Sequence, residues 1–181
     1  TSDIFKNKIS DIQANGITNT VAGMKLGKTS INLGPCTIHN NYIGGLFSPN
    51  SGVDNAIKAI EFSSTSDASD YNFYYNSIYL NATSIGADFG SSIMTATSGS
   101  GFVQLDLRNN IFVNTSTPTG TGLNTVYRGL SLTPTLYKST TNNNLLYAGT
   151  PDAQRLIYYS SVSVFDQTLG AFQARVYPRD N

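Results

Sequence analysis

The sequence predicts an all-β fold, a right-handed parallel β-helix of about five coils with a short helix near its end, from three observations. Residues 105–113 alternate apolar and polar side chains, as a half-buried strand does, and then break the alternation at a pair of asparagines. Similar phrases stand at 36–43 and 71–78, with weaker copies at 4–9 and 141–146. Aligning the copies gives asparagines at steps of 34, 35, 34 and 34 residues, namely Asn7, Asn41, Asn76, Asn110 and Asn144. A strand that recurs at constant spacing indicates a solenoid, in which each copy lies parallel and in register on the next.

The positions around each asparagine predict the core. Two residues after it, every copy has an apolar side chain: Ile9, Ile43, Ile78, Phe112 and Leu146. Three residues before it, four of the five copies do: Ile4, Ile38, Phe73 and Leu107, with Thr141 in the last. We expect these columns to be buried, with the six residues of the three central copies nearly inaccessible.

The asparagines themselves are predicted to form a ladder. Each one falls where the strand bends, and asparagine tolerates the left-handed backbone conformation that a sharp turn needs. Stacked at about 4.8 Å, successive side-chain amides are placed to bond to one another and to the turn backbone. A buried polar column of this kind is tolerable because each member satisfies the next.

The remainder of each coil holds further strand-like segments. A second strand is expected at 22–26, 56–62, 90–96 and 126–132, and a third short one leads into the next asparagine phrase. The whole chain, 1–181, is read as a single β-helix domain and as a segment of a longer protein. We expect its first coil to abut another coil, domain or subunit, because an uncovered strand edge promotes association.

The end of the chain departs from the repeat. Leu169, Phe172 and Val176 fall on one helical face, which predicts a short amphipathic helix at about 167–176. Either Thr168 or Asp166 is suited to cap its first turn. Two roles stay open for this helix: closing the end of the solenoid, or standing as an insertion before further coils.

Three stretches carry a resemblance to a known family. Residues 105–111, 142–149 and 166–175 resemble the pectate-lyase-like right-handed β-helix repeats of large secreted bacterial surface proteins. The resemblance implies a secreted or cell-surface location and, for many members, export by the type IX route with a separate sorting domain. It does not imply an activity, because this fold hosts lyases, hydrolases, epimerases, adhesins and passive stalks.

Composition excludes some partners. Charged residues make up 12% of the chain and the formal net charge is +0, so no phosphate-rich partner such as nucleic acid is expected. No run of eighteen apolar residues exists, so no membrane insertion is expected. Low charge with many hydroxyl and amide side chains is common in secreted bacterial β-structure.

The acidic residues do not form the pattern that catalysis on polysaccharides needs. Lyases of this fold use clustered carboxylates for calcium with a basic residue, and hydrolases use two or three acids on one face. Only Asp3 and Asp106 share a column, three coils or roughly 14 Å apart. Asp67 and Asp70 are close in sequence but stand in a serine-rich link. We therefore assign no catalytic residue, no metal site and no cofactor.

One outward column has the chemistry of a glycan contact. Two residues before the ladder position stand His39, Tyr74 and Arg108, which are expected to stack on adjacent coils beside Asn72 and Asp106. An aromatic ring beside amide, carboxylate and guanidinium groups suits a sugar. The alternative is a ladder of similarly shaped side chains that only covers its strands.

Two functions follow from these observations. The first is a non-catalytic extracellular module, structural or adhesive, that contacts glycans or neighbouring subunits. The alternative is a polysaccharide lyase or glycoside hydrolase whose catalytic residues lie partly in this chain. The scarcity of charge and the absence of a carboxylate cluster in the repeat columns favour the first.

Overall fold

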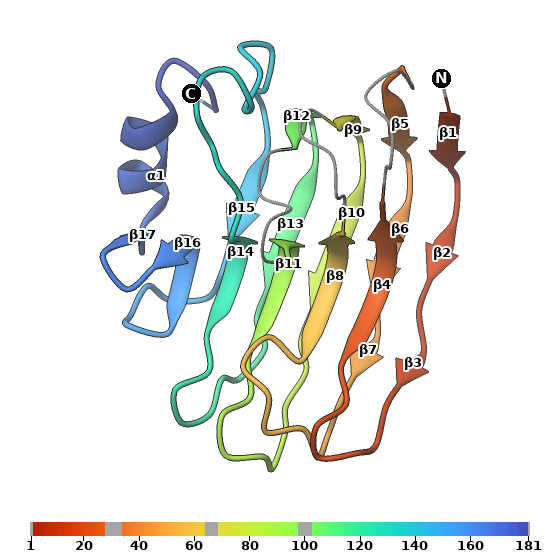
Figure 1. The fold of residues 1–181 in the computed structure, drawn as a ribbon, viewed down its shortest axis with the longest axis vertical. Coiled ribbons are helices and arrows are strands. Elements are labelled where there is room, and N and C mark those ends of the chain that lie inside the picture. The colour runs from red at the N-terminus through yellow and green to blue at the C-terminus, as the bar shows by residue number, and fades with distance from the viewer. Residues whose placement is uncertain (1, 28–33, 64–68, 98–102, 181) are drawn as a thin grey trace.

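The chain winds into a β-solenoid, described here from a computed structural model that covers residues 2–27, 34–63, 69–97 and 103–180. Figure 1 shows the coils standing side by side, from β1 at the N-terminal end to α1 at the C-terminal end. Equivalent strands of successive coils pair in parallel, so three sheets run along the solenoid.

Each sheet collects equivalent strands from successive coils. The first sheet contains β1 (Ser2–Phe5), β5 (Cys36–His39), β9 (Asp70–Tyr74) and β12 (Gln104–Arg108). The second contains β2 (Lys8–Ile9), β6 (Tyr42–Gly44), β10 (Ser77–Leu80), β13 (Ile111–Asn114) and β15 (Leu145–Tyr147). The third contains β4 (Val21–Leu26), β8 (Ile57–Phe62), β11 (Ser91–Ala96), β14 (Asn124–Arg128), β16 (Arg155–Ser161) and β17 (Val164–Asp166). A short pair, β3 (Ile12–Gln13) and β7 (Leu46–Phe47), completes the first coils.

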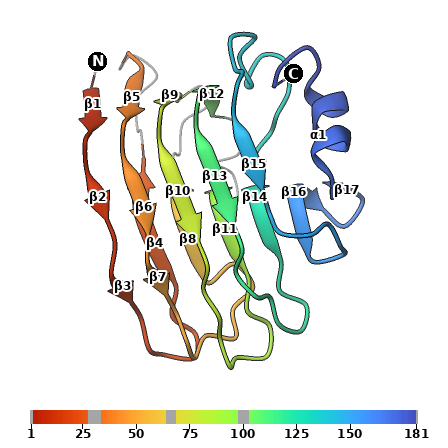
Figure 2. The same cartoon turned by 180° about the vertical axis from the view of Figure 1, so that it is seen from behind.

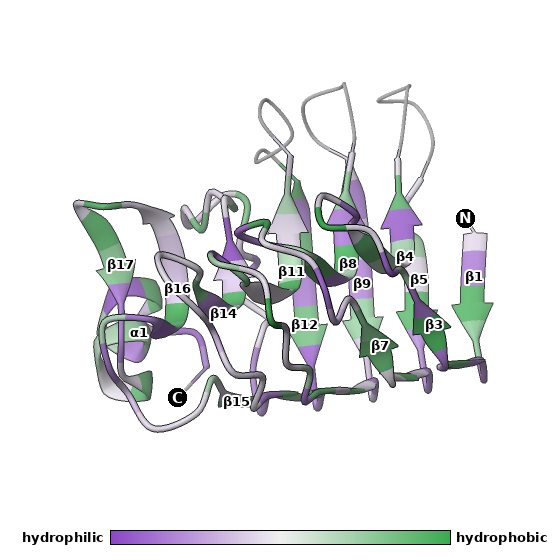
Figure 3. Ribbon diagram, turned by 90° about the horizontal axis from the view of Figure 1, so that it is seen from below, coloured by the Kyte–Doolittle hydropathy of each residue, from purple (hydrophilic) through white to green (hydrophobic). Residues whose placement is uncertain are grey.

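The strand register matches the repeat alignment. In the first sheet Ile38 pairs with Phe73 and Phe73 with Leu107, and in the second Ile43 pairs with Ile78 and Ile78 with Phe112. All six side chains are at most 2% exposed, which confirms the predicted core. Hydrophobic and hydrophilic bands alternate along strands such as β9 and β12 (Figure 3).

The solenoid has about four turns where the sequence predicts about five. The last copy contributes β15, but the segment before it reaches β12 only through isolated bridges, Leu105 to Tyr137 and Arg108 to Asn142. Thr141 stands there in place of an apolar side chain, and Pro134 lacks the N–H of a strand residue. The second strand predicted at 126–132 also ends early, at Arg128, because Gly129 adopts a φ of +67°.

The sharp bend is placed one residue away from the prediction. The left-handed conformation belongs to the residue before each ladder asparagine, with φ between 55° and 59° at Lys6, Asn40, Tyr75, Asn109 and Asn143. The ladder asparagines do not supply the bend. Their side chains instead turn inward and hold successive bends together.

A chain of side-chain hydrogen bonds runs through the five asparagines. Each Nδ2 donates to the Oδ1 of the next, at 3.0 Å from Asn7, 3.0 Å from Asn41, 3.0 Å from Asn76 and 2.9 Å from Asn110. The backbone N–H of each donor residue reaches the same oxygen at 3.0–3.1 Å. Asn41, Asn76 and Asn110 are buried, and their second amide hydrogen reaches a backbone carbonyl of the preceding coil.

The C-terminal end is built differently from the coils. After β16 the chain turns back as β17, which pairs antiparallel with it, and continues into α1 (Leu169–Val176). Thr168 caps this helix by accepting from the N–H of Ala171 at 3.2 Å. The other capping candidate, Asp166, instead accepts from Arg175 at 2.5 Å. Phe172 and Val176 are buried against the coils, while Leu169 stays 40% exposed.

The segment after α1 returns to the ladder. Asp180 is buried, and its Oδ1 accepts from Asn144 Nδ2 at 2.8 Å. Its Oδ2 accepts from the hydroxyl of Tyr137, and its backbone carbonyl accepts from Gln173 at 2.6 Å. The last asparagine of the ladder therefore has an acceptor although no further coil follows it among the described residues.

Candidate functional site

The residues selected from the sequence lie on adjacent strands of the first sheet. His39, Tyr74 and Arg108 form one register column across β5, β9 and β12. Asn72 and Asp106 pair in the column two residues earlier. The structure brings three of the five into direct contact: Tyr74, Asp106 and Arg108.

These three side chains form a closed polar network. Arg108 donates to Asp106 from Nε at 2.9 Å and from Nη2 at 2.6 Å. The Tyr74 hydroxyl donates to Oδ2 of Asp106 at 2.9 Å, and the guanidinium of Arg108 lies over the Tyr74 ring, 5.3 Å from its centre. Asp106 is 4% exposed, so its carboxylate acts as the shared acceptor that fixes the other two.

The pKa values of this network follow from its geometry. Burial and the hydrogen bond to Asp106 raise the pKa of Tyr74 to about 12. Burial raises the pKa of Asp106, but the hydrogen bonds from Arg108, Tyr74 and Thr140 together outweigh it, and the pKa is lowered. Asp106 is therefore held ionised, and the Tyr74 hydroxyl is held protonated.

The other two predicted residues stand apart from the network. The His39 ring stacks on Phe5, with centroids 5.0 Å apart and an interplanar angle of 0°, and its Nδ1 lies 3.2 Å from Asn40 Nδ2. Asn72 is half-buried on β9, in register between Thr37 and Asp106. His39 and Asn72 thus extend the surface of the column without joining its hydrogen bonds.

The carboxylates considered for catalysis are separated. Asp70 pairs with Lys138 at 2.6 Å, while its sequence neighbour Asp67 lies outside the described residues. Asp3 is exposed on β1, at the far edge of the sheet from Asp106. Within the described ranges, no group of three histidine, cysteine or acidic side chains is arranged to hold a metal ion.

Sequence reasoning missed a second outward surface, on the second sheet. Its large side chains are 39–51% exposed and form what we term the aromatic face: Tyr42, Tyr79, Ile111, Leu145 and Tyr147. Their strands β6, β10, β13 and β15 run side by side in Figure 2. The repeat contains the pattern that predicts this face. Its residues stand one or three positions after a ladder asparagine, whereas the core residue stands two positions after it, so they point to the opposite side of the strand.

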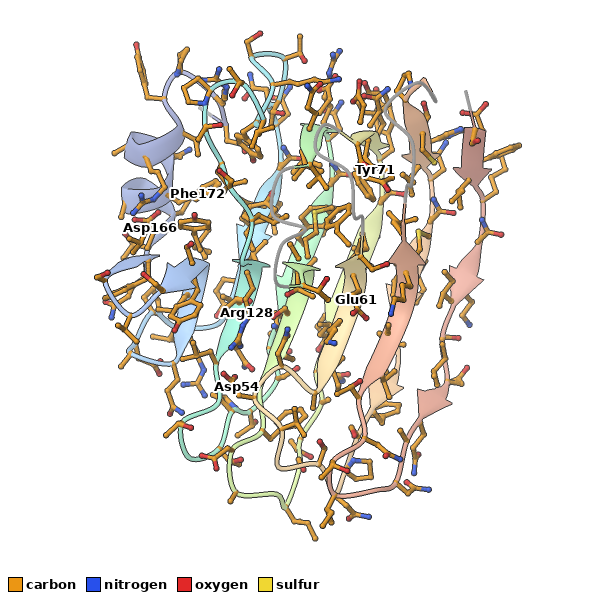
Figure 4. The ribbon with its side chains drawn as sticks, in the orientation of Figure 1. Asp54, Glu61, Tyr71, Arg128, Asp166 and Phe172 are labelled. Atoms are coloured by element: carbon orange, nitrogen blue, oxygen red, sulfur yellow. The ribbon has the colours of Figure 1, made fainter. Side chains whose placement is uncertain are left out.

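The outer side of the third sheet carries a second set of paired charges. Asp54 accepts from Arg128 at 2.8 Å and 2.5 Å, and the two side chains meet across the loop before β8 and the end of β14 (Figure 4). On β8, Oε1 of Glu61 lies 3.5 Å from Nζ of Lys58 and 3.8 Å from Nζ of Lys25. A cavity of about 430 Å³ opens beside Asp54, between the third sheet and the β16–β17 hairpin. Residues 74 positions apart in sequence meet at this pair, so local motifs gave no indication of it.

Comparison of the chain with models of known families, with curated proteins and with solved structures finds no match. In the parts of the chain that the structure describes, no helix combines the length and apolarity needed to cross a membrane. The surfaces described above therefore have to be interpreted from their own chemistry.

Proposed function

We propose that this chain is a non-catalytic module of a secreted bacterial surface protein, which serves as a rigid structural element and adheres to glycans. The sequence resemblance to pectate-lyase-like repeats of type IX-exported proteins supports the extracellular location. The β-solenoid supports the structural role, because three sheets and one buried hydrogen-bond ladder run through the coils.

The aromatic face is the observation that carries the adhesive part. Apolar side chains gathered on one exposed surface usually mark a contact site. Tyr79 and Tyr147 stand in one register column with Val113 between them, so their backbones are about 9.5 Å apart. Tyrosine presents an apolar ring and a polar hydroxyl together, which suits the C–H faces and hydroxyl groups of successive sugar units. A flat sheet holds such rings at fixed spacing.

The network around Asp106 makes this carboxylate unsuited to act as a general acid. A general acid for glycoside cleavage needs a carboxyl group whose pKa is raised. The pKa of Asp106 is lowered, and Arg108 and Tyr74 already occupy its oxygens. This carboxylate is suited to position its neighbours and unsuited to deliver a proton.

The proposal is tested by incubating the chain with immobilised cellulose, xylan, mannan and pectate and measuring retention and soluble products. We expect retention of at least one polymer without release of oligosaccharides. The double variant Tyr79→Ala, Tyr147→Ala should lower retention about tenfold or more, whereas Ile85→Ala, at a position 88% exposed in the loop between β10 and β11, serves as the control. Depolymerisation that a single Asp substitution abolishes would refute the non-catalytic function, and equal retention by the double variant would refute the role of the aromatic face.

A further inference from the structure

The cavity beside Asp54 is formed by segments far apart in the sequence, from the loop before β8 to the β16–β17 hairpin. It has a volume of about 430 Å³, within the range of small-molecule sites. The loops before β8 and β14 and the β16–β17 hairpin provide its lining: Asp54, Thr121, Leu123, Ala153, Leu156, Tyr159, Val162, Phe165 and Gln167.

One side of the cavity is apolar and aromatic. Tyr159 and Phe165 are register partners on the antiparallel strands β16 and β17. Leu156, which also lines the cavity, is buried, and Phe165 is 41% exposed. The guanidinium of Arg128 lies 5.4 Å from the centre of the Tyr159 ring, which fixes that ring against the sheet. Two neighbouring aromatic side chains thus offer a surface for the C–H face of a sugar ring.

The polar side of the cavity carries acceptors and donors without a net positive charge. The Asp54 carboxylate is held by Arg128 and by the N–H of Leu123 at 3.0 Å. The Thr121 hydroxyl donates to Oδ1 of Asp88 at 2.8 Å, so its oxygen can still accept a hydrogen bond from a ligand. Within the described residues the side-chain amide of Gln167 has no hydrogen-bond partner, so it is available to a ligand as donor and acceptor.

The charges select against an acidic ligand. Asp54 and Arg128 neutralise each other, and the next cation along β16, Arg155, is paired with Asp152. Asp88 adds a carboxylate beside Thr121. A uronic acid or a sulfated sugar would find no unpaired cation among the described residues of the lining and would lie close to carboxylates.

We propose that this cavity binds a neutral hexopyranose unit, at an end or a branch of a polysaccharide. In this arrangement the ring stacks on Tyr159 and Phe165, while the carboxylate of Asp54 and the amide of Gln167 bond its hydroxyl groups. The proposal rests on the glycan function above but uses a different surface. Its failure is therefore separable from failure of the aromatic face.

The test is titration of the whole chain with glucose, galactose, mannose and N-acetylglucosamine, and with glucuronic and galacturonic acid, followed by NMR of the side-chain amides. We expect saturable shifts of the Gln167 amide with at least one neutral sugar and weaker binding of both acids. Phe165→Ala and Gln167→Ala should each weaken binding by about tenfold. Val164→Ala, the neighbour on the opposite side of β17, is the matched control and should leave binding unchanged. Circular dichroism verifies that each variant is folded.

The outcomes separate the two proposals. Folded protein that shows no saturable shift with any neutral sugar, while polymer retention through the aromatic face persists, overturns the cavity site alone. Tighter binding of the uronic acids overturns its neutral specificity. If hexose binding is saturable but the Tyr79→Ala, Tyr147→Ala variant retains polymers as well as the wild type does, the cavity site is supported. The proposed role of the aromatic face is then overturned.

Discussion

The carboxylate of Asp180 accepts the hydrogen bond that Asn144 would otherwise give to a sixth asparagine. The Nδ2 to Oδ1 distance is 2.8 Å, close to the 2.9–3.0 Å within the ladder itself. A residue outside the repeat therefore supplies the acceptor for a partly buried amide at the last coil.

Replacing Asp180 by asparagine is expected to change the pH dependence of stability. Burial raises the pKa of Asp180, against the hydrogen bonds from Tyr137 and Asn144. Because the folded pKa is the higher one, Asp180 stabilises most below the ordinary aspartate pKa of about 3.9, and this contribution is lost as pH rises through the folded pKa. The side chain of Asp180→Asn does not titrate, so the variant should not lose stability in this way. We therefore expect its unfolding free energy, relative to that of the wild type, to increase from acid to neutral pH.

Asp180→Ala provides the contrast. It leaves Asn144 and the buried hydroxyl of Tyr137 without an acceptor, so we expect a loss of about 1–3 kcal/mol in unfolding free energy at acid pH, where the contribution of Asp180 is fully present, and a smaller loss at neutral pH. Denaturant unfolding of the three proteins at several pH values measures both effects. A difference between wild type and Asp180→Asn that does not vary with pH would contradict the raised pKa.

Removing a central member of the ladder should destabilise the solenoid. Asn76→Ala deprives Asn41 of its acceptor and Asn110 of its donor inside the core, at an expected cost of about 1–3 kcal/mol. Asn50→Ala is the control, because its one hydrogen bond, to the carbonyl of Asn15, is exposed. We expect that control to change unfolding free energy by less than about 0.5 kcal/mol. Equal losses for the two variants would show that the ladder adds no stability.

Two adjacent residues of β13 test the strand register. Phe112 is fully buried, with its ring centre 6.4 Å from that of Tyr127, and Phe112→Ala should cost about 3–5 kcal/mol. Ile111 points the other way and is 48% exposed, so Ile111→Ala should cost about 1 kcal/mol or less. Chemical denaturation compares the pair directly. A reversed order would mean that the strand is shifted by one residue, which moves every side chain to the opposite face.

Tyr75 is the residue at which a substitution should stabilise the fold. It holds a φ of 57°, a conformation that costs a non-glycine residue about 1–2 kcal/mol, and asparagine occupies the equivalent bend at positions 40, 109 and 143. Tyr75→Asn should therefore raise the unfolding free energy by about 0.5–1 kcal/mol. Tyr79→Asn, in the extended strand β10, should lower it, because asparagine is a poor strand residue. Thermal unfolding of the wild type and both variants measures these changes. A lower stability of Tyr75→Asn would show that the contacts of the tyrosine ring stabilise the fold by more than its left-handed backbone destabilises it.

The repeat itself made the strands and the core predictable. Residues such as Phe73, Leu107 and Phe112 stand at fixed distances from an asparagine, so a single alignment places all of them. The same alignment located the column of Tyr74 and Arg108, although the hydrogen bonds to Asp106 depend on side-chain conformations that no periodicity specifies.

Features outside the repeat were not predictable in this way. Asp180 reaches Asn144 only because the chain reverses after α1, and Asp54 meets Arg128 across the loop before β8. The antiparallel β17 has no equivalent in the other coils. The left-handed residue was misplaced by one position, because the asparagine pairs in the repeat offered two candidates and the buried ladder needs the second for its side chain.

All the side-chain amides of the ladder point in one direction, with each N–H directed toward the next coil. Their dipoles add along the solenoid, as peptide dipoles add along a helix, and give a positive end at Asn144 and a negative end at Asn7. Asp180, whose pKa is raised by burial, lies at the positive end, where the dipoles favour its ionised form. Adding coils to such a column would strengthen the field at this carboxylate, so the number of coils and the ionisation of the terminal aspartate are electrostatically coupled.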